Sequence, residues 1–347
     1  MPYTRLTALV LLPAALAWLT AASRGEAQQP TPPSQSTAPT KQPAAQPGSP
    51  AQGKPAPTPQ GPPPPKADPE AVKTFKRLAE GLDPKKLGYL ETAFRESVQS
   101  SNFSFAAQGT YRSGPHHELR LDLKTEILGQ PGDLQFVSDG VTVWKAIRLN
   151  SGRRAVSKWD VKPVTEALSH ADFPAQLRDD FFRTQSFSGL APLLENLRKQ
   201  LVFTKQESGQ WEGKNITRLT GVWVEEIGKS LGGPSSPWPL YVPRRCVLFV
   251  GEVPDGKLWP YRIEWWGPLK QRGEDSLLVA MEFRDPKIYP ADAKPPAELT
   301  NSFVFNAGKD EPADETKQLV EQFTRIREIA KSRQKTPPPP AGAKTGK

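Results

Sequence analysis

The stretch "SDGVTVWK", Ser138–Lys145, decides between a catalytic loop and a β-hairpin. An Asp-Gly pair stands between two runs in which apolar and other residues alternate. Asp-Gly between alternating runs is the strongest short-range signal for a hairpin closed by a two-residue turn, with positive φ at both central residues. The sequence therefore predicts a hairpin with Asp139 and Gly140 at its tip, and no catalytic role for them.

The predicted hairpin carries apolar residues on both of its faces. Its register pairs Phe136 with Val143 and Val137 with Thr142. One face then carries Val137, Trp144 and Ala146, and the other carries Leu134, Phe136, Val141 and Val143. An antiparallel sheet that is wet on one side alternates apolar and polar residues. We therefore expect both faces of this sheet to be covered.

Segments with the same alternation are separated by segments whose apolar residues have helical spacing. Together they predict an α+β fold of about ten strands. Strand patterns span residues 103–112, 118–128, 134–138, 141–149, 155–159, 201–205, 215–224, 245–250, 259–266, 277–283 and 302–305. Apolar residues at helical spacing predict helices over residues 69–81, 87–98, 164–169, 175–182, 190–201 and 315–331. Most of the helices are thus inserted midway through the strands or placed at the ends of the domain.

The ends of the chain differ in composition from this middle part. Residues 1–27 have the layout of a secretory signal peptide, for which a membrane anchor is the alternative. Residues 28–67 contain 14 prolines in 40 residues and no aromatic residue, which predicts a disordered tether. We expect one domain over residues 68–335 and a disordered, Pro-rich tail over 336–347.

The composition of the chain limits which metals, nucleic acids and membrane surfaces it is expected to bind. The sole thiol, Cys246, allows no internal disulfide and no cysteine-based metal site. The net charge of +9 comes partly from the tails. Because the aromatic residues lie in strand-like runs and the chain is expected to be exported, we expect no nucleic-acid partner. The positive charge allows peripheral contact with an anionic membrane surface.

Motifs that resemble catalytic or metal sites are incomplete. "HHELR", residues 116–120, lacks the second histidine of a zinc-protease motif, because position 121 is leucine. "GKS", residues 228–230, lacks the first glycine of a phosphate-binding loop, because position 223 is tryptophan. We therefore expect no enzyme activity, no cofactor and no bound metal.

Two segments resemble the superfamily of periplasmic lipoprotein carriers of the LolA and LolB type. The segment "SDGVTVWKAIRLNSGRRAVSKWDVKPV", residues 138–164, resembles the family's Asp-Gly-x-x-x-Trp hairpin and the short helix that follows. The segment "MEFRDPKIYPADAKPPAELTNSFVFNAGKDEPADET", residues 281–316, resembles its closing strands, with a final Phe-x-Phe strand. With its Pro-rich N-terminal tether, the chain also resembles a secreted planctomycete-type domain of uncharacterised function.

The resemblance implies a strongly curved antiparallel sheet, an incomplete β-barrel with an apolar cavity for acyl chains. Under this hypothesis the protein is exported to the periplasm or cell envelope and binds lipid or lipoprotein acyl chains. The candidate cavity residues are large apolar side chains: Phe136, Val143, Trp144, Trp223, Phe249, Tyr261, Ile263, Trp265, Met281 and Phe283. The alternative is an envelope interaction or stress-sensing module of related fold that binds a peptide or protein partner.

The predicted tether should be dispensable for folding. It has no aromatic side chain to contribute to a core, so deletion of Gln28–Pro65 should leave the melting temperature nearly unchanged. Thermal unfolding of the two proteins side by side checks this. A fall of many degrees would show that the segment packs against the domain.

Overall fold

A single sheet of twelve strands organises the part of the chain that the structure describes. The computed structural model describes residues 65–100, 104–127, 130–150, 152–174, 178, 189–231, 238–240, 242–270 and 274–335. Its strands lie in the order β12-β6-β5-β4-β3-β2-β1-β11-β10-β9-β8-β7. Neighbouring strands pair in antiparallel fashion, except for the parallel contact between β12 and β6. The predicted α+β class and antiparallel sheet are confirmed, and β12 and β7 remain as free ends of an open sheet.

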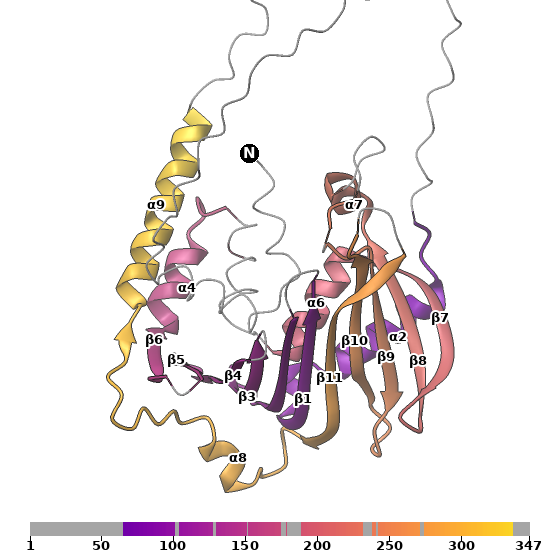
Figure 1. Cartoon of the computed structure of the whole chain (residues 1–347), viewed down its shortest axis with the longest axis horizontal. Helices are drawn as coiled ribbons and strands as arrows, with labels where there is room; N and C mark the ends of the chain where they lie inside the picture. Colours follow the sequence, from indigo (N-terminus) through magenta and orange to yellow (C-terminus); the bar gives the residue numbers. More distant parts are fainter. Residues whose placement is uncertain are drawn as a thin grey trace, which may run out of the picture.

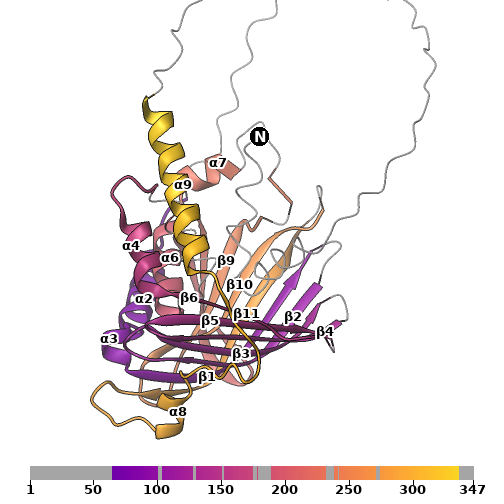
Figure 2. The ribbon, with the colours of Figure 1, turned by 90° about the vertical axis from the view of Figure 1, so that its left-hand side faces the viewer.

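The strands fall into two halves that meet at β1. The first half consists of β1 (Tyr89–Gln99), β2 (Ser104–Ser113), β3 (Glu118–Ile127), β4 (Gln130–Asp139), β5 (Thr142–Leu149) and β6 (Ala155–Asp160). The second consists of β7 (Leu201–Trp211), β8 (Lys214–Trp223), β9 (Arg245–Glu252), β10 (Leu258–Pro268) and β11 (Asp275–Tyr289), whereas the short β12 (Ala313–Asp314) joins the edge of β6. Figure 2 shows the two halves running in different directions, so the sheet is strongly curved.

Helices cover one face of the sheet. They are α2 (Pro69–Gly81), α3 (Pro84–Leu87), α4 (Val161–Ser169), α6 (Leu190–Gln200), α7 (Glu225–Leu231) and α9 (Thr316–Lys335), whereas the short α8 (Ala297–Asn301) belongs to the segment that crosses the opposite face. Helix α2 packs on β7, β8 and β10 and on α6, while α4 packs on β6 and α9 (Figure 1). We call the covered face the helix face and the opposite one the outer face. The predicted cover of helices, placed midway and at the ends, is confirmed.

Helix α2 shows why the sequence folds as predicted at this point. Asp68 caps it, since its carboxylate accepts hydrogen bonds from the backbone N–H groups of Glu70 and Ala71. Its apolar positions fall on one side, and Phe75 stacks on Phe203 of β7 with ring centroids 4.3 Å apart. The capping residue and the helical spacing of the apolar residues thus give the same answer.

The helix predicted over residues 87–98 is wrong, because this segment is strand β1. The side chains buried on its helix face alternate and are Leu90, Thr92, Phe94, Glu96 and Val98. Its apolar residues alone fall four apart, which fits a helix face as well as every second strand position. Two polar residues in buried positions concealed the period of two.

The hairpin forms with a different turn from the one predicted. Val137 pairs with Trp144, and Ser138 pairs with Val143, so the register is shifted by two residues. The Asp139 carboxylate accepts hydrogen bonds from the N–H groups of Val141 and Thr142, at 2.8 and 2.7 Å. Of the two central residues of the predicted turn, Asp139 and Gly140, only Gly140 has positive φ, at 86°. Because a shift of two residues preserves the faces, Trp144 and Phe136 still lie on opposite sides.

Both faces of the hairpin are covered, as its apolar pattern predicts. The outer face is crossed by residues 290–314, which we call the strap (Figure 1). The Phe305 ring stacks on Trp144 with centroids 5.0 Å apart, and Arg120 donates to the backbone carbonyl of Ser302 at 2.6 Å. The strand predicted over residues 302–305 is therefore wrong: its aromatic side chains anchor the strap without joining the sheet.

Some predictions concern residues outside the part that the structure describes. They are the signal peptide, the tether up to residue 64, the tail over 336–347 and the helix over 175–182, of which only residue 178 is described. Among the described residues, no helix combines the length and apolar character required to cross a membrane.

Replacing Gly140 should destabilise the domain. Its positive φ disfavours a β-branched side chain, and a Cβ would lie 2.6 Å from the carbonyl oxygen of His116 in the β2–β3 turn. We expect Gly140→Val to lower the free energy of unfolding by about 2 kcal/mol or more, measured by denaturant titration.

Gly213, in the β7–β8 turn, provides the matched control. Its φ is 75°, but no atom lies within 4 Å of its Cβ position. Gly213→Val therefore introduces the backbone strain without the clash and should cost less. Equal stability of Gly140→Val and the wild type would contradict the turn geometry described above.

Candidate functional site: an apolar cavity on the helix face

A cavity of about 420 Å³ lies between the sheet and the helices on the helix face. Strands β1 to β6, the end of α3, α4 and the N-terminus of α6 contribute to its walls. The apolar lining residues are Leu82, Leu87, Leu90, Tyr111, Pro115, Leu119, Phe136, Val143, Trp159, Val161, Leu190, Ala191 and Pro192. This size and composition are typical of small-molecule sites, which have volumes of about 300–1,000 Å³.

Polar side chains line part of the same cavity. They are Ser113, His117, Glu118, Ser138 and Thr165. His117 is exposed and lies in the β2–β3 turn, so the lining reaches the protein surface at this turn. The Glu118 carboxylate is engaged there by the backbone N–H of His116, at 2.7 Å. The cavity thus has a mainly apolar wall and a solvent-accessible rim at His117 and Glu118, whereas Ser138 is buried.

Tyr111 fixes the helix wall of the cavity against the sheet. Its hydroxyl accepts a hydrogen bond from the backbone N–H of Leu190, at 3.1 Å, where α6 begins. Gly189 precedes the helix with φ of 89°, and a Cβ there would lie 3.0 Å from the same hydroxyl. Burial raises the pKa of Tyr111, so the phenol stays neutral. This contact holds α6 in register with β2 beside the cavity.

The structure places two of the ten predicted cavity residues in this lining, Phe136 and Val143. Six others lie on the helix face of the second half of the sheet, in the packed core: Trp223, Tyr261, Ile263, Trp265, Met281 and Phe283. Trp223 stacks on Trp265 with ring centroids 5.9 Å apart, and Phe94 contacts Phe283 at 5.3 Å. These side chains belong to the packed core and do not line the cavity, although the Phe283 ring centroid lies 6.2 Å from that of Tyr111 in the cavity wall.

Trp144 and Phe249 lie on the outer face, so a single cavity cannot include all ten residues. Trp144 stacks under the strap, and Phe249 lies beside the Arg262 guanidinium, 6.0 Å from the ring centroid. The sequence pattern gave each residue a face within its own strand. It did not contain the information about which face the helices would cover.

The residues that sequence reasoning missed come from several separate segments. Tyr111, Leu119, Trp159 and Leu190 all lie in elements that were predicted, and their burial side follows from the alternation. Their meeting at one place depends on the packing of α4 and α6, which no local signal specifies.

Glu96 of β1 has a buried carboxyl group on the helix face of the sheet. It is 3% exposed, and its cross-strand neighbours are Ala107 and Met281. Neither its Oε1 atom nor the Oγ1 atom of Thr125, one strand beyond Ala107, makes a hydrogen bond. Burial raises the pKa of Glu96 to about 8. The carboxyl group is therefore mostly protonated at neutral pH.

Groups of metal-binding side chains are absent from the residues that the structure describes. Cys246 is buried, and burial raises its pKa well above the usual value, with the nearby Glu264 carboxylate adding to the effect. A thiol in this state is a poor nucleophile. The cavity offers apolar contact and hydrogen bonds at its rim.

Comparisons with known proteins give similarity at the level of solved structures only. No protein-family model matches the chain, and no curated protein sequence matches it either. MucB matches with 14% identity over 69% of this chain and 64% of that chain, with a TM-score of 0.29. The MucA/MucB complex of Pseudomonas aeruginosa matches with 16% identity over 69% and 62%, with a TM-score of 0.28.

A putative outer membrane lipoprotein-sorting protein domain from Vibrio parahaemolyticus matches with 8% identity over 67% of this chain and 98% of that chain, with a TM-score of 0.22. The chain spans less than two thirds of the length of the two MucB structures. The resemblance to lipoprotein carriers stays a prediction.

The raised pKa of Glu96 predicts a pH-dependent stability. The folded state holds this proton up to about pH 8, whereas the unfolded chain releases it near 4.5. The folded protein thus binds more protons between these values, so its stability falls as pH rises through this window. The slope from one such group is at most about 1.4 kcal/mol per pH unit.

Glu96→Gln isolates this contribution, because all other titrating groups are common to both proteins. We expect the variant to gain stability relative to the wild type from pH 5 to pH 9, measured by denaturant unfolding at each pH. A difference that stays constant over this range would show that Glu96 keeps an ordinary pKa in the folded protein.

Proposed function

We propose that this domain binds the apolar chain of a lipid or lipoprotein in the cavity on its helix face. The observation that carries the proposal is the 420 Å³ cavity, in which leucine, valine and aromatic side chains form most of the wall and His117 and Glu118 stand where the lining reaches the surface. An acyl chain would occupy the body. Its polar head would lie near His117, where the lining reaches solvent.

The energetics of this cavity suit a long chain. Each buried methylene contributes about 0.8 kcal/mol, so ten carbons contribute about 8 kcal/mol before the cost of association. Polar groups in the rim can hydrogen-bond a head group without taking a charge into the apolar body. The proposal therefore requires neither a metal ion nor a nucleotide.

An exported carrier or binding protein of the cell envelope fits this chemistry. The alternative remains a module that binds a peptide or protein partner of the envelope, with an apolar segment of the partner in the same cavity. The two functions are distinguished by the ligand that suffices for binding. A lipid-binding protein binds a free fatty acid, whereas a module that binds a protein partner requires the partner's polypeptide.

A fluorescent fatty-acid analogue titrated into delipidated full-length protein tests the proposal. We expect saturable binding at about micromolar strength, displaced by unlabelled palmitate. Val143→Phe and Ala191→Phe fill the cavity from the sheet side and from the helix side. Each should weaken binding about tenfold or more while the protein remains folded by circular dichroism.

Trp265→Phe is the matched control, because Trp265 lies in the packed half of the core outside the cavity lining. It should bind the probe as the wild type does. If Trp265→Phe abolished binding and both cavity-filling variants bound normally, the ligand would lie elsewhere. No saturable binding by any protein, with no lipid retained on purification, would overturn the proposal.

A further inference from the structure

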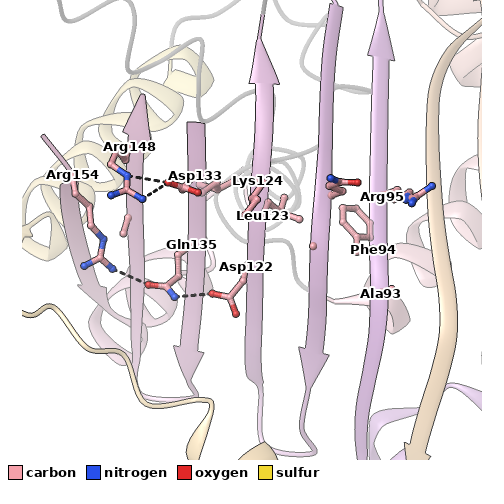
Figure 3. Close-up of a pocket in the computed structure, with 14 residues that line it drawn as sticks. Ala93, Phe94, Arg95, Asp122, Leu123, Lys124, Asp133, Gln135, Arg148 and Arg154 are labelled. Carbon is pink, nitrogen blue, oxygen red and sulfur yellow. Dashed lines mark hydrogen bonds and ion pairs between the residues drawn. The ribbon is translucent and has the colours of Figure 1, made fainter. Parts of the chain in front are cut away.

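The outer face of the sheet carries two adjoining hollows on the side opposite the apolar cavity. One has a volume of about 750 Å³ and is lined by residues of β1 to β5 together with Arg154 (Figure 3). The other has a volume of about 580 Å³ and extends towards β11. Arg95, Gln108 and Lys124 line both hollows. These three side chains therefore stand at the junction of the two.

The three residues form one row across the sheet. Arg95 of β1 pairs with Gln108 of β2, which pairs with Lys124 of β3. Adjacent strands lie about 4.8 Å apart, so the Arg95 and Lys124 backbones are separated by roughly 10 Å. The rows on either side contain small residues, Ala93 and Ala146 in one hollow and Ala106 and Ala280 in the other. The long side chains of this row thus separate the two hollows, which lie over the shorter side chains on either side.

Almost every other cation around this row is already paired. Arg148 donates to the Asp133 carboxylate at 2.9 Å, and Figure 3 shows this pair beside the row. A second chain of contacts runs from Arg154 to Gln135, at 2.8 Å, and from Gln135 to Asp122, at 2.7 Å (Figure 3). On the other side, Arg284 donates to Glu282 at 2.8 Å.

Arg95, Gln108 and Lys124 differ from these neighbours. Within the described part of the chain, none of the three makes a side-chain hydrogen bond or an ion pair, and all are exposed. The carboxylates beside the row, Glu282 and Asp133, are engaged by other arginines. The junction of the hollows therefore has two cations and an amide without partners.

One carboxylate nearby is also unpaired among the described residues. Glu126 lies two residues beyond Lys124 on β3 and lines only the 580 Å³ hollow. Its negative charge lowers the potential on that side of the row. An anion is therefore favoured on the side of the 750 Å³ hollow, where Asp122 and Asp133 are both neutralised by arginine.

We infer that the Arg95–Gln108–Lys124 row binds a phosphate-type anion. An arginine guanidinium, an amide N–H₂ and a lysine ammonium supply donors from three adjacent strands. Such a set fits a tetrahedral group with several oxygens better than a carboxylate with two. The hollow is larger than one phosphate, so it also accommodates the group to which a phosphate ester is attached.

The phosphate can belong to a lipid head group or to a soluble phosphate compound, and two probes separate these sources. Inorganic phosphate is titrated into the full-length protein by calorimetry. Vesicles of phosphatidylcholine with and without phosphatidylglycerol are used in a flotation assay. We expect weak saturable phosphate binding that decreases with added sodium chloride, because exposed charges are screened by salt.

The double variant Arg95→Gln, Lys124→Gln removes the two cations while keeping polar side chains. We expect it to lower phosphate affinity about tenfold or more. Lys73→Gln with Lys76→Gln removes the same charge from the exposed side of α2 and should leave the affinity within about twofold. This control separates a local site from the general effect of net charge.

The outcomes show whether the row binds phosphate and whether that phosphate belongs to a lipid or to a soluble compound. Loss of both phosphate binding and flotation with phosphatidylglycerol vesicles in the double variant supports a lipid head-group site. Loss of phosphate binding alone supports a soluble phosphate ester. If the wild type binds neither probe, or if the α2 control loses as much binding as the double variant, the inference is wrong. Both results are independent of acyl-chain binding in the cavity on the other face.

Discussion

The pairing of β1 with β11 holds the two halves of this fold together. Tyr89 pairs with Tyr289 and Val98 with Val279, so the first strand of the domain lies against a strand nearly two hundred residues later. On its other side β1 pairs with β2 along its whole length. Every strand from β2 to β6 is thus attached to β7–β11 through this one strand. The cavity depends on the same junction, because Leu90 of β1 forms part of its wall.

The sequence predicted the class of fold better than the location of the site. Alternation and turn residues identified the strands of the first hairpins, and the helical spacing of apolar residues identified α2. The hairpin register was missed by two residues, because the Asp139 side chain satisfies the turn and moves the positive φ to Gly140 alone. The assignment of side chains to the two faces of the hairpin was still correct, because a register shift by an even number of residues leaves each side chain on the same face.

The remaining errors have a common physical origin in tertiary contacts. Thr92 and Glu96 are buried polar residues, and they concealed β1 because burial of such residues is decided by neighbours distant in sequence. Phe303 and Phe305 had a strand-like pattern, but they pack on Tyr89 and Trp144 of different strands and leave the backbone outside the sheet. The large apolar side chains of β8–β11 lie in the packed core, and the alternation within each strand did not show which of them would line a cavity.

The strap gives the sheet a protected border. Its last two residues, Ala313 and Asp314, pair with Ser157 and Lys158 of β6, and Arg154 binds Asp310 just before them. An uncovered edge strand offers free N–H and C=O groups to any other extended chain, which is the usual start of intermolecular β-aggregation. At the opposite border, the N–H of Asp68 binds the carbonyl of Phe203 on β7, and Lys205 and Glu207 place charges there. The segments that enter and leave the sheet thus occupy part of both of its edges.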